Sequence, residues 1–254
     1  MRGYAQYCPI AKGSEILGDR WTLLIVREML GGASGFNELQ RGLPGISRSV
    51  LTDRLRSLER AEIVERRTGP KGRTLEYRLT LAGRDLEAVV QAIGEWGVTW
   101  SFTDPRPDEL DPDLLIVWMA RHVDRDQLPP DRTVVQFDFR NPTKRYWMVL
   151  EPSDVSVCLR HPGFDVDLEV RVDTATLYRV YLGRADLRGA MRARKLTLSG
   201  PRVLQRAFGR WFAWSAFAPA SRRAVQRRSA ASRLAQPERV RVEQPLPAYP
   251  RSSA

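Results

Sequence analysis

Apolar residues recur every three or four positions through most of the first hundred residues, which is the repeat of a helix with one buried side. This spacing predicts helices over 10–17 and 21–30, the second with Asp19 as its N-cap and with glycines at 31 and 32 as its stop signal. The residues of the second helix expected to face the core are Trp21, Leu24, Ile25 and Met29. The first part of the chain is therefore expected to be mostly helical.

The clearest local pattern lies between residues 36 and 79. A short helix over 36–40 runs into a Gly/Pro-rich turn at 42–45, and a second helix opens at Ser47. The buried side of this second helix is marked by Leu51, Leu55 and Leu58. A strand–turn–strand pattern follows over 64–79. This order predicts a winged helix-turn-helix, a module that places one helix in the major groove of DNA.

A long amphipathic helix is expected after the wing, with Thr80 as its cap and its end near Trp100. One apolar stripe runs along it, formed by Leu86, Val89, Val90, Ile93, Trp96, Gly97 and Trp100. The stripe either packs on its own domain or forms a dimer helix. Two tryptophans at its end favour the dimer, because a small domain rarely buries so much apolar surface on one terminal helix.

Beyond a proline-marked linker at 105–112 the pattern changes to a mixture of strands and helices. Strands are expected at 133–139, 146–150, 155–159, 168–172 and 196–198, and helices at 114–123, 174–182, 186–192 and 203–216. The fold class is thus α+β in two domains: a winged helix-turn-helix over 1–104 and an α+β domain with a mostly antiparallel sheet over 113–218. The tail 219–254 is rich in Arg, Ser, Ala, Pro and Gln and is expected to be disordered.

Composition narrows the class of protein. The chain has 254 residues and is 43% hydrophobic, enough for packed cores. It has no run of 18 apolar residues and no apolar leader at its start, so neither a membrane span nor a signal peptide is expected. Two cysteines, Cys8 and Cys158, do not make a disulfide framework. These features favour a cytoplasmic protein without membrane association.

The net charge of +11 suggests a polyanionic partner, but its distribution changes that picture. Residues 1–104 hold 15 Lys and Arg against 13 Asp and Glu, and residues 105–218 hold 18 against 15. The tail 219–254 holds 8 against 2. Most of the excess therefore lies outside the helix-turn-helix, and local placement is the better guide to DNA binding.

The helix that opens at Ser47 is the expected recognition helix. With its leucines inside, helical geometry turns Ser49, Asp53, Arg56 and Arg60 outward and leaves Thr52 at the flank. Arg48 lies near the end that meets base edges, whereas Arg54 and Arg56 suit phosphates. The candidate DNA contacts are Ser47, Arg48, Ser49, Thr52, Arg54 and Arg56 of this helix, with Lys71 and Arg73 of the wing.

Residues 8–100 resemble the HxlR-type branch of the MarR-like winged-helix transcriptional regulators. The matching segments are Cys8-Pro9, Leu17 to Ile25, Phe36 to Leu39, Leu43 to Ser47, Leu51 to Leu55, Tyr77 to Thr80, and Trp96. The resemblance implies a homodimer that binds double-stranded DNA at a pseudo-palindromic operator. Glu62-Ile63 departs from the Asp-Gly-Leu more usual in the family, which affects only the turn into the wing.

Cysteine and histidine chemistry is sparse. Cys8 matches a position that some relatives use as a redox sensor, and Lys12, one turn along, would favour its thiolate modestly. An unreactive Cys8 is the favoured alternative.

His122 and His161 have no ligand spacing, so no metal site is expected. No Ser/His/Asp or metal constellation supports an enzyme, and no cofactor is implied.

The second domain resembles the sterol-carrier-protein fold. The residues that carry the likeness are Asp186-Leu187, Leu196 to Pro201, Leu204 and Trp211-Phe212. The resemblance implies a sheet and helices around an apolar tunnel. Its candidate walls are Trp118, Phe137, Phe139, Trp147, Phe208, Trp211 and Phe212, although ordinary core filling is the better explanation for any single one of them.

These patterns together favour a dimeric DNA-binding transcriptional regulator, in the first place a repressor, whose C-terminal domain binds an apolar effector or serves dimerisation. The alternative is a lipid-binding or lipid-transfer protein whose helix-turn-helix makes protein contacts. DNA binding distinguishes the two.

Overall fold

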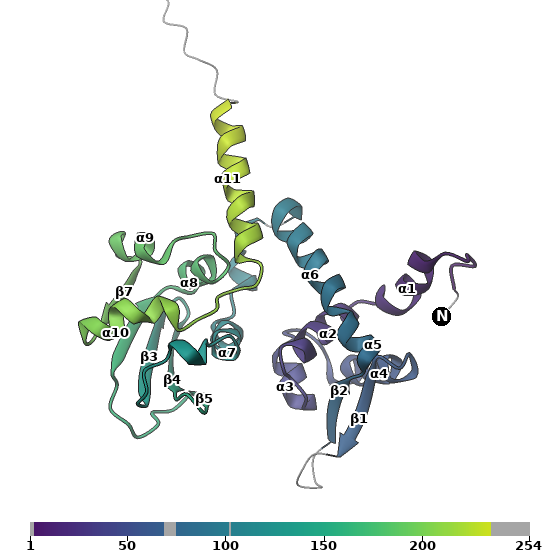
Figure 1. Ribbon diagram of the computed structural model, residues 1–254, viewed down its shortest axis with the longest axis horizontal. Helices are drawn as coiled ribbons and strands as arrows, with labels where there is room; N and C mark the ends of the chain where they lie inside the picture. Colours follow the sequence, from purple (N-terminus) through teal and green to yellow (C-terminus); the bar gives the residue numbers. More distant parts are fainter. Residues whose placement is uncertain (1–2, 69–74, 102, 235–254) are drawn as a thin grey trace, which may run out of the picture.

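The chain forms a helical N-terminal domain and a sheet-containing C-terminal domain (Figure 1). The computed structural model describes residues 3–68, 75–101 and 103–234, with side chains described as far as 227. The α+β class is as predicted, with a winged helix-turn-helix first and a five-stranded sheet second.

The predicted order of elements in the N-terminal domain is confirmed. The elements are α1 (Pro9–Leu17), α2 (Thr22–Leu30), α3 (Phe36–Arg41), α4 (Arg48–Arg60), β1 (Val64–Thr68) and β2 (Leu75–Leu79). The two strands pair antiparallel with Val64 opposite Leu79. One core joins them, built largely from Ile25, Val26, Leu39, Leu51, Leu55 and Leu58. The helices therefore pack as a compact support for α4.

Two expectations for α2 were wrong. Trp21, not Asp19, occupies its N-cap, with a left-handed φ of 80°. Asp19 does not cap because its carboxylate instead pairs with Arg54 on α4. Leu24 is 40% exposed, because the buried side of α2 is centred on Ile25, Val26 and Met29 and leaves Leu24 at its edge.

The helix that follows the wing is interrupted. Thr80 caps it as expected, accepting a hydrogen bond from Gly83 N at 3.1 Å. The expected single helix is, however, divided into α5 (Leu81–Asp85), α6 (Glu87–Trp96) and the π-helix η1 (Gly97–Ser101). At Leu86 the ψ angle of −8° tightens the backbone into a turn, so α6 begins anew there.

The C-terminal domain is a five-stranded sheet with helices packed on it. After the short helix η2 (Pro107–Glu109), its elements are α7 (Pro112–Arg121), η3 (Arg125–Gln127), β3 (Thr133–Arg140), β4 (Thr143–Leu150), β5 (Val155–Cys158), β6 (Leu168–Val172), α8 (Thr174–Tyr181), α9 (Leu187–Arg192), β7 (Leu196–Ser199), α10 (Arg202–Ala207) and η4 (Phe208–Arg210). The strand order is β5-β4-β3-β6-β7. Only the β3–β6 pairing is parallel, so the mostly antiparallel sheet is confirmed.

The two faces of this sheet differ. Phe137, Phe139 and Tyr146 point to the face covered by the helices, where the main core lies. Trp147 points to the other face, and its ring lies 5.5 Å from that of His161. The segment 159–167 reaches that face because β5 is an edge strand whereas β6 pairs with β3. The chain must therefore cross β4 and β3 to pass from β5 to β6.

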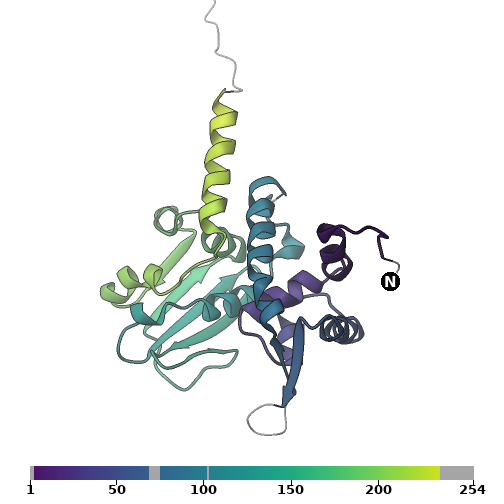
Figure 2. The same ribbon diagram turned by 45° about the vertical axis from the view of Figure 1, so that its right-hand side comes forward.

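The C-terminal end of the domain departs from prediction. The helix expected over 203–216 stops at Ala207 and continues only as the single turn η4. The tail expected to be disordered from 219 instead forms α11 (Ala218–Leu234) as far as it is described. Ala220, Ser221 and Ala224 are buried, and α11 packs against η1 beside α6 (Figure 2). Small side chains allow this close approach, which composition alone does not reveal.

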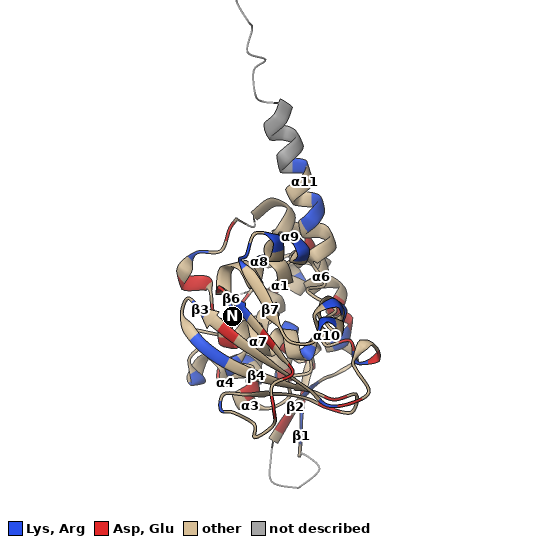
Figure 3. Cartoon of the chain, turned by 90° about the vertical axis from the view of Figure 1, so that its left-hand side faces the viewer, with Lys and Arg blue, Asp and Glu red and all other residues tan. Residues whose placement is uncertain are grey.

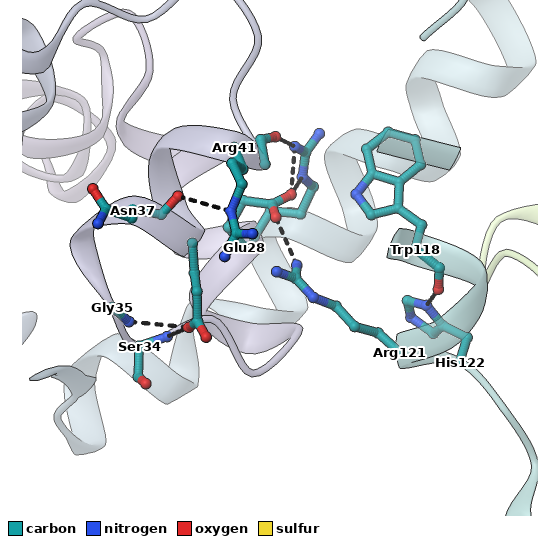
Figure 4. A network of polar contacts seen from close by, with 11 residues as sticks. Glu28, Ser34, Gly35, Asn37, Arg41, Trp118, Arg121 and His122 are labelled. Atoms are coloured by element: carbon teal, nitrogen blue, oxygen red, sulfur yellow. Dashed lines mark hydrogen bonds and ion pairs between the residues drawn. The ribbon is translucent and has the colours of Figure 1, made fainter. Parts of the chain in front are cut away.

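Two groups of contacts hold the domains together. Glu28 on α2 is 2% exposed and pairs with Arg27 of its own helix and with Arg121 on α7, each at 2.7 Å (Figure 4). The Arg27 guanidinium also lies 5.3 Å from the ring centroid of Trp118 on α7. At the second contact, a Cβ added to Gly94 would lie 2.1 Å from the Phe217 ring. An ion-pair network and a close apolar contact thus join α2 and α6 to the C-terminal domain.

The Arg54–Asp19 pair anchors α4 to the segment before α2, with each side chain only 25% exposed. We expect Arg54→Met to lower the free energy of unfolding by about 1–2 kcal/mol, between the values for surface and buried pairs. Urea unfolding measures this. The matched control is Arg56→Met on the exposed side of the same helix, for which a change within about 0.5 kcal/mol is expected. Equal losses in both variants would contradict an anchoring role for Arg54.

Candidate nucleic-acid interface

The orientation of α4 follows from its own sequence. Ser47 has extended backbone angles, and its Oγ accepts a hydrogen bond from Val50 N at 3.2 Å, which starts the helix. Leu51, Leu55 and Leu58 are buried in the N-terminal core. The opposite side of the first two turns of α4 therefore faces away from the protein.

That side carries most of the candidate DNA contacts. Ser47, Arg48, Ser49 and Arg56 are exposed. Thr52 is half-buried and donates its hydroxyl hydrogen bond to Arg48 O at 2.8 Å, so it offers a methyl group and one acceptor outward. Five of the six predicted positions on α4 thus lie at or beside one exposed surface.

Arg54, the sixth position, does not join them. Its guanidinium is turned toward Asp19 and half-buried. The helical repeat alone suggested a phosphate contact, but the repeat does not show which neighbouring loop supplies a carboxylate. The geometry gives Arg54 a supporting role in place of the phosphate contact.

Arg48 is held by α3, which sequence reasoning did not anticipate. Its Nη1 donates to Gln40 Oε1 at 3.1 Å and to Asn37 Oδ1 at 3.4 Å, and its guanidinium lies 4.8 Å from the Phe36 ring centroid. A guanidinium oriented in this way loses less side-chain entropy on binding a base or phosphate. The sequence shows that the outer side of α3 is polar. It does not show that these polar residues bind Arg48.

The start of α3 is itself fixed by a charged cap. The Glu38 carboxylate accepts hydrogen bonds from Ser34 N at 3.0 Å and Gly35 N at 3.1 Å (Figure 4). The bond from Ser34 above all, with that from Gly35, holds the pKa of Glu38 below its usual value despite partial burial. The helix that orients Arg48 is therefore locked at its first turn.

Much of the charge on the described part of the wing is paired. Arg66 bonds to Glu59 at 2.7 Å, Arg67 to Glu65 at 2.8 Å, and Arg78 to Glu76 at 3.0 Å. The two predicted wing contacts, Lys71 and Arg73, lie outside the described residues and stay predictions. Within the described part of the wing, these basic side chains are already engaged by neighbouring carboxylates.

Cys8 sits half-buried at the N-cap position of α1. Lys12 was expected to favour the thiolate of Cys8, but its ammonium instead pairs with Glu15 at 3.0 Å. That hydrogen bond, with another from Tyr4 N, lowers the pKa of Glu15. A redox role for Cys8 stays a prediction without support from Lys12.

The seven aromatic residues expected to line one pocket do not all lie together. Trp147 is on the far face of the sheet, and Trp118 stacks on Tyr181 near the domain contact with a centroid separation of 6.3 Å. Phe208 packs directly on other core rings, 6.2 Å from Phe137 and 5.9 Å from Trp211. The alternation of a strand puts successive residues on opposite faces, so a list of aromatics could not identify a common wall. The group is mainly core.

The described part of the chain lacks two other kinds of site. Within 3–68, 75–101 and 103–234, no three His, Cys, Asp or Glu side chains gather as a metal site requires. No helix of that part is both long enough and apolar enough to cross a bilayer.

Comparison with known proteins agrees with this geometry. Residues 16–104 match the HxlR-like helix-turn-helix family, and residues 121–212 match the SCP-2 sterol transfer family. The chain is 36% identical over 105 residues to the uncharacterized HTH-type transcriptional regulator YvaP of Bacillus subtilis, covering 39% of this chain and 97% of YvaP. An uncharacterized HTH-type regulator of Mycobacterium tuberculosis is 40% identical over 102 residues, with 39% of this chain and 61% of that protein covered.

Among solved structures, the reduced form of the transcriptional regulator YodB from B. subtilis is 35% identical. The match covers 38% of this chain and 96% of YodB, with a TM-score of 0.34. Because nearly the whole length of YvaP aligns with one part of this chain, the chain belongs to the HxlR-like helix-turn-helix family of transcriptional regulators, and it carries an SCP-2-type domain beyond that module.

Proposed function

We propose that this protein binds double-stranded DNA as a homodimer at a pseudo-palindromic operator and acts there as a repressor. The observation that carries the proposal is the exposed side of α4, on which Arg48, already oriented by Gln40 and Asn37, lies beside Ser47, Ser49 and Arg56. A helix of this kind reads base edges with its first turn and meets phosphates further along.

Dimerisation is supported by apolar surface left open on the N-terminal domain. One side of α6 meets Phe217 at Gly94, and η1, which contains the buried Val98, packs on α11. Ile93, Trp96 and Trp100 remain 50%, 62% and 68% exposed. Exposed tryptophans on one helical segment are costly in a monomer and typical of a protein interface. Of the stripe itself, Leu86 and Val90 pack against the N-terminal core, and the exposed Ile93, Trp96 and Trp100 support the proposed dimer helix.

The DNA interface is tested with Arg56→Ala. Arg56 is exposed where a phosphate contact is proposed, so its loss should weaken binding to the promoter of the protein's own operon. The slope of log K against log salt should become shallower by about 0.9. Fluorescence anisotropy across a salt series measures both quantities. Arg106→Ala, which removes an exposed charge from the linker, should leave them unchanged; a wild-type response of Arg56→Ala would remove this residue from the interface.

The dimer interface is tested with Ile93→Asp and Trp96→Asp. A carboxylate placed in an apolar interface must be desolvated without a partner, so both variants should sediment as monomers or lose solubility. Leu81→Asp is the matched control, because Leu81 is 70% exposed on α5, outside the stripe of α6 and η1. A soluble dimer from both stripe variants would place the interface elsewhere in the chain.

An apolar effector of the C-terminal domain is the second part of the proposal. It is supported by the match of residues 121–212 to the SCP-2 sterol transfer family. It is also supported by Trp211, whose buried Nε1 has no hydrogen-bond acceptor among the described residues. A buried donor left in this way favours a ligand that brings one oxygen acceptor into an otherwise apolar space. Such a ligand must displace some of the close ring packing around Phe208.

Palmitate, which joins an apolar chain to a carboxylate, is a suitable probe of this site. At a hundredfold excess over its Kd it should stabilise the full chain by about 2.7 kcal/mol, measured as a thermal shift. Trp211→Phe keeps the ring and removes the donor, so its shift should be smaller. No shift with palmitate or cholesterol would leave the domain without this effector role. A shift without any DNA binding would favour the lipid-carrier alternative.

A further inference from the structure

One stretch of the C-terminal domain is unusually basic. From residue 187 to residue 237 the sequence contains no Asp or Glu. The part that spans α9, β7, α10 and η4 carries seven basic side chains, all of them exposed. These are Arg188, Arg192, Arg194, Lys195, Arg202, Arg206 and Arg210, which we call the arginine surface.

The helices that carry the arginine surface are neighbours. A Cβ added to Gly209 of η4 would lie 3.0 Å from the Leu187 side chain of α9. A groove of about 350 Å³, lined by Leu187, Trp214 and Arg222 among others, continues the same region to α11. In Figure 1 α9 and α10 lie on the side of the C-terminal domain away from the helix-turn-helix, and Figure 3 shows basic segments on α9, α10 and α11 from that side. The charge is therefore gathered on one side of the domain.

Among the described residues this charge is not neutralised by ion pairs. Elsewhere in the same domain basic side chains have carboxylate partners: Arg132 pairs with Glu151, Lys144 with Asp113, and Arg145 with Asp138. None of the ion pairs between described residues includes a member of the arginine surface. Unpaired like charges on one surface raise the local potential and attract a polyanion.

The side chains around these charges indicate which polyanion fits. Six of the seven are arginine, whose planar guanidinium binds phosphate oxygens in pairs. On these elements Val203 is the only exposed large hydrophobic residue among those described, with 70% exposure. A membrane-binding surface uses several apolar or aromatic anchors, and a single-strand site uses exposed aromatic rings for stacking. The phosphate backbone of a duplex needs neither.

We propose that the arginine surface is a second DNA contact, which binds the backbone of duplex DNA beside the operator. The proposal rests on the operator binding proposed above. Phosphate contacts carry no sequence information, so this surface adds affinity and not specificity. Because α9 and α10 lie on the side of the C-terminal domain away from the helix-turn-helix, flanking DNA must bend around that domain to reach the arginine surface. DNA tethered at the operator in this way is present at high effective concentration, and weak contacts with it increase the overall affinity. The SCP-2-type domain thereby takes part in DNA binding directly.

The test compares two double variants of the full chain with the same net charge. Arg202→Gln with Arg206→Gln removes two charges from α10. Arg145→Gln with Arg160→Gln removes two from the other face of the sheet, where the segment following β5 passes. On a duplex that extends well beyond the operator, the α10 variant should have a salt slope shallower by up to about 1.8, and the control should match wild type. On a duplex trimmed to the operator, all three proteins should agree.

Hydroxyl-radical footprinting provides a second readout. Wild type and control should protect backbone beyond the operator, and the α10 variant should protect the operator alone with an unchanged ratio of operator to random-sequence affinity. Identical slopes and footprints for all three proteins on the long duplex would overturn the proposal. So would loss of binding to phosphatidylserine-containing vesicles by the α10 variant with unchanged DNA binding, which would identify a lipid surface instead.

Failure of the proposed function gives a different result. If wild type shows no preference for any promoter fragment, operator recognition fails. A shallower salt slope of the α10 variant on random duplex DNA would then still support the arginine surface, and an unchanged slope would reject both.

Discussion

Glu28 is an acidic residue with 2% of its surface exposed, and it lies where the two domains meet. Taking a carboxylate out of water costs several kcal/mol, so it stays buried only with close cationic partners. It has two: Arg27 on its own helix and Arg121 from the C-terminal domain, each at 2.7 Å. Removal of Arg121 would leave the buried carboxylate of Glu28 with one cationic partner, which destabilises the fold because the cost of desolvation is then only partly compensated. Docking of the domains and integrity of the N-terminal core are therefore linked through one side chain.

The ion pairs of Glu28 are also connected to the helix-turn-helix through Arg27. The Nη2 of Arg27 also donates to Gly42 O at 3.3 Å, in the turn between α3 and α4. A Cβ added to Gly42 would lie 2.0 Å from the Glu28 carboxylate, so the turn and the ion pair are in contact. The same α3 orients Arg48 through Asn37 and Gln40. The contacts that hold the C-terminal domain to α2 are therefore separated only by α3 from the contacts that orient Arg48 on α4.

The segment formed by α6 and η1 has apolar residues on two sides, and only one of these sides is covered by the C-terminal part of the chain. Gly94 is small enough for Phe217 to approach α6, and α11 packs its alanines on η1. Trp96 and Trp100, on the outer side of α6 and η1, are 62% and 68% exposed and have no such cover from the described residues. Within the C-terminal domain, by contrast, Phe137, Phe208 and Trp211 cover one another, and the core gains from the edge-to-face contact of Phe208 with Trp211 as well as from burial. Much of the exposed apolar surface among the described residues therefore lies on the N-terminal helices.

The sequence by itself determined the winged helix-turn-helix and nearly every strand and helix of the second domain, because these depend on local periodicity, caps and turns. The Ser47 cap, the Leu51, Leu55 and Leu58 side of α4, and the alternation of β3 are readable from neighbours a few residues apart. What the tertiary structure decided depends on residues far apart in the chain: Asp19 with Arg54, Glu28 with Arg121, and Arg48 with Gln40. The packing of α11 on η1 belongs to the same class. Helical and strand repeats specify which way a side chain points, whereas its partner is set by how whole elements pack, and one sequence pattern is compatible with many such packings.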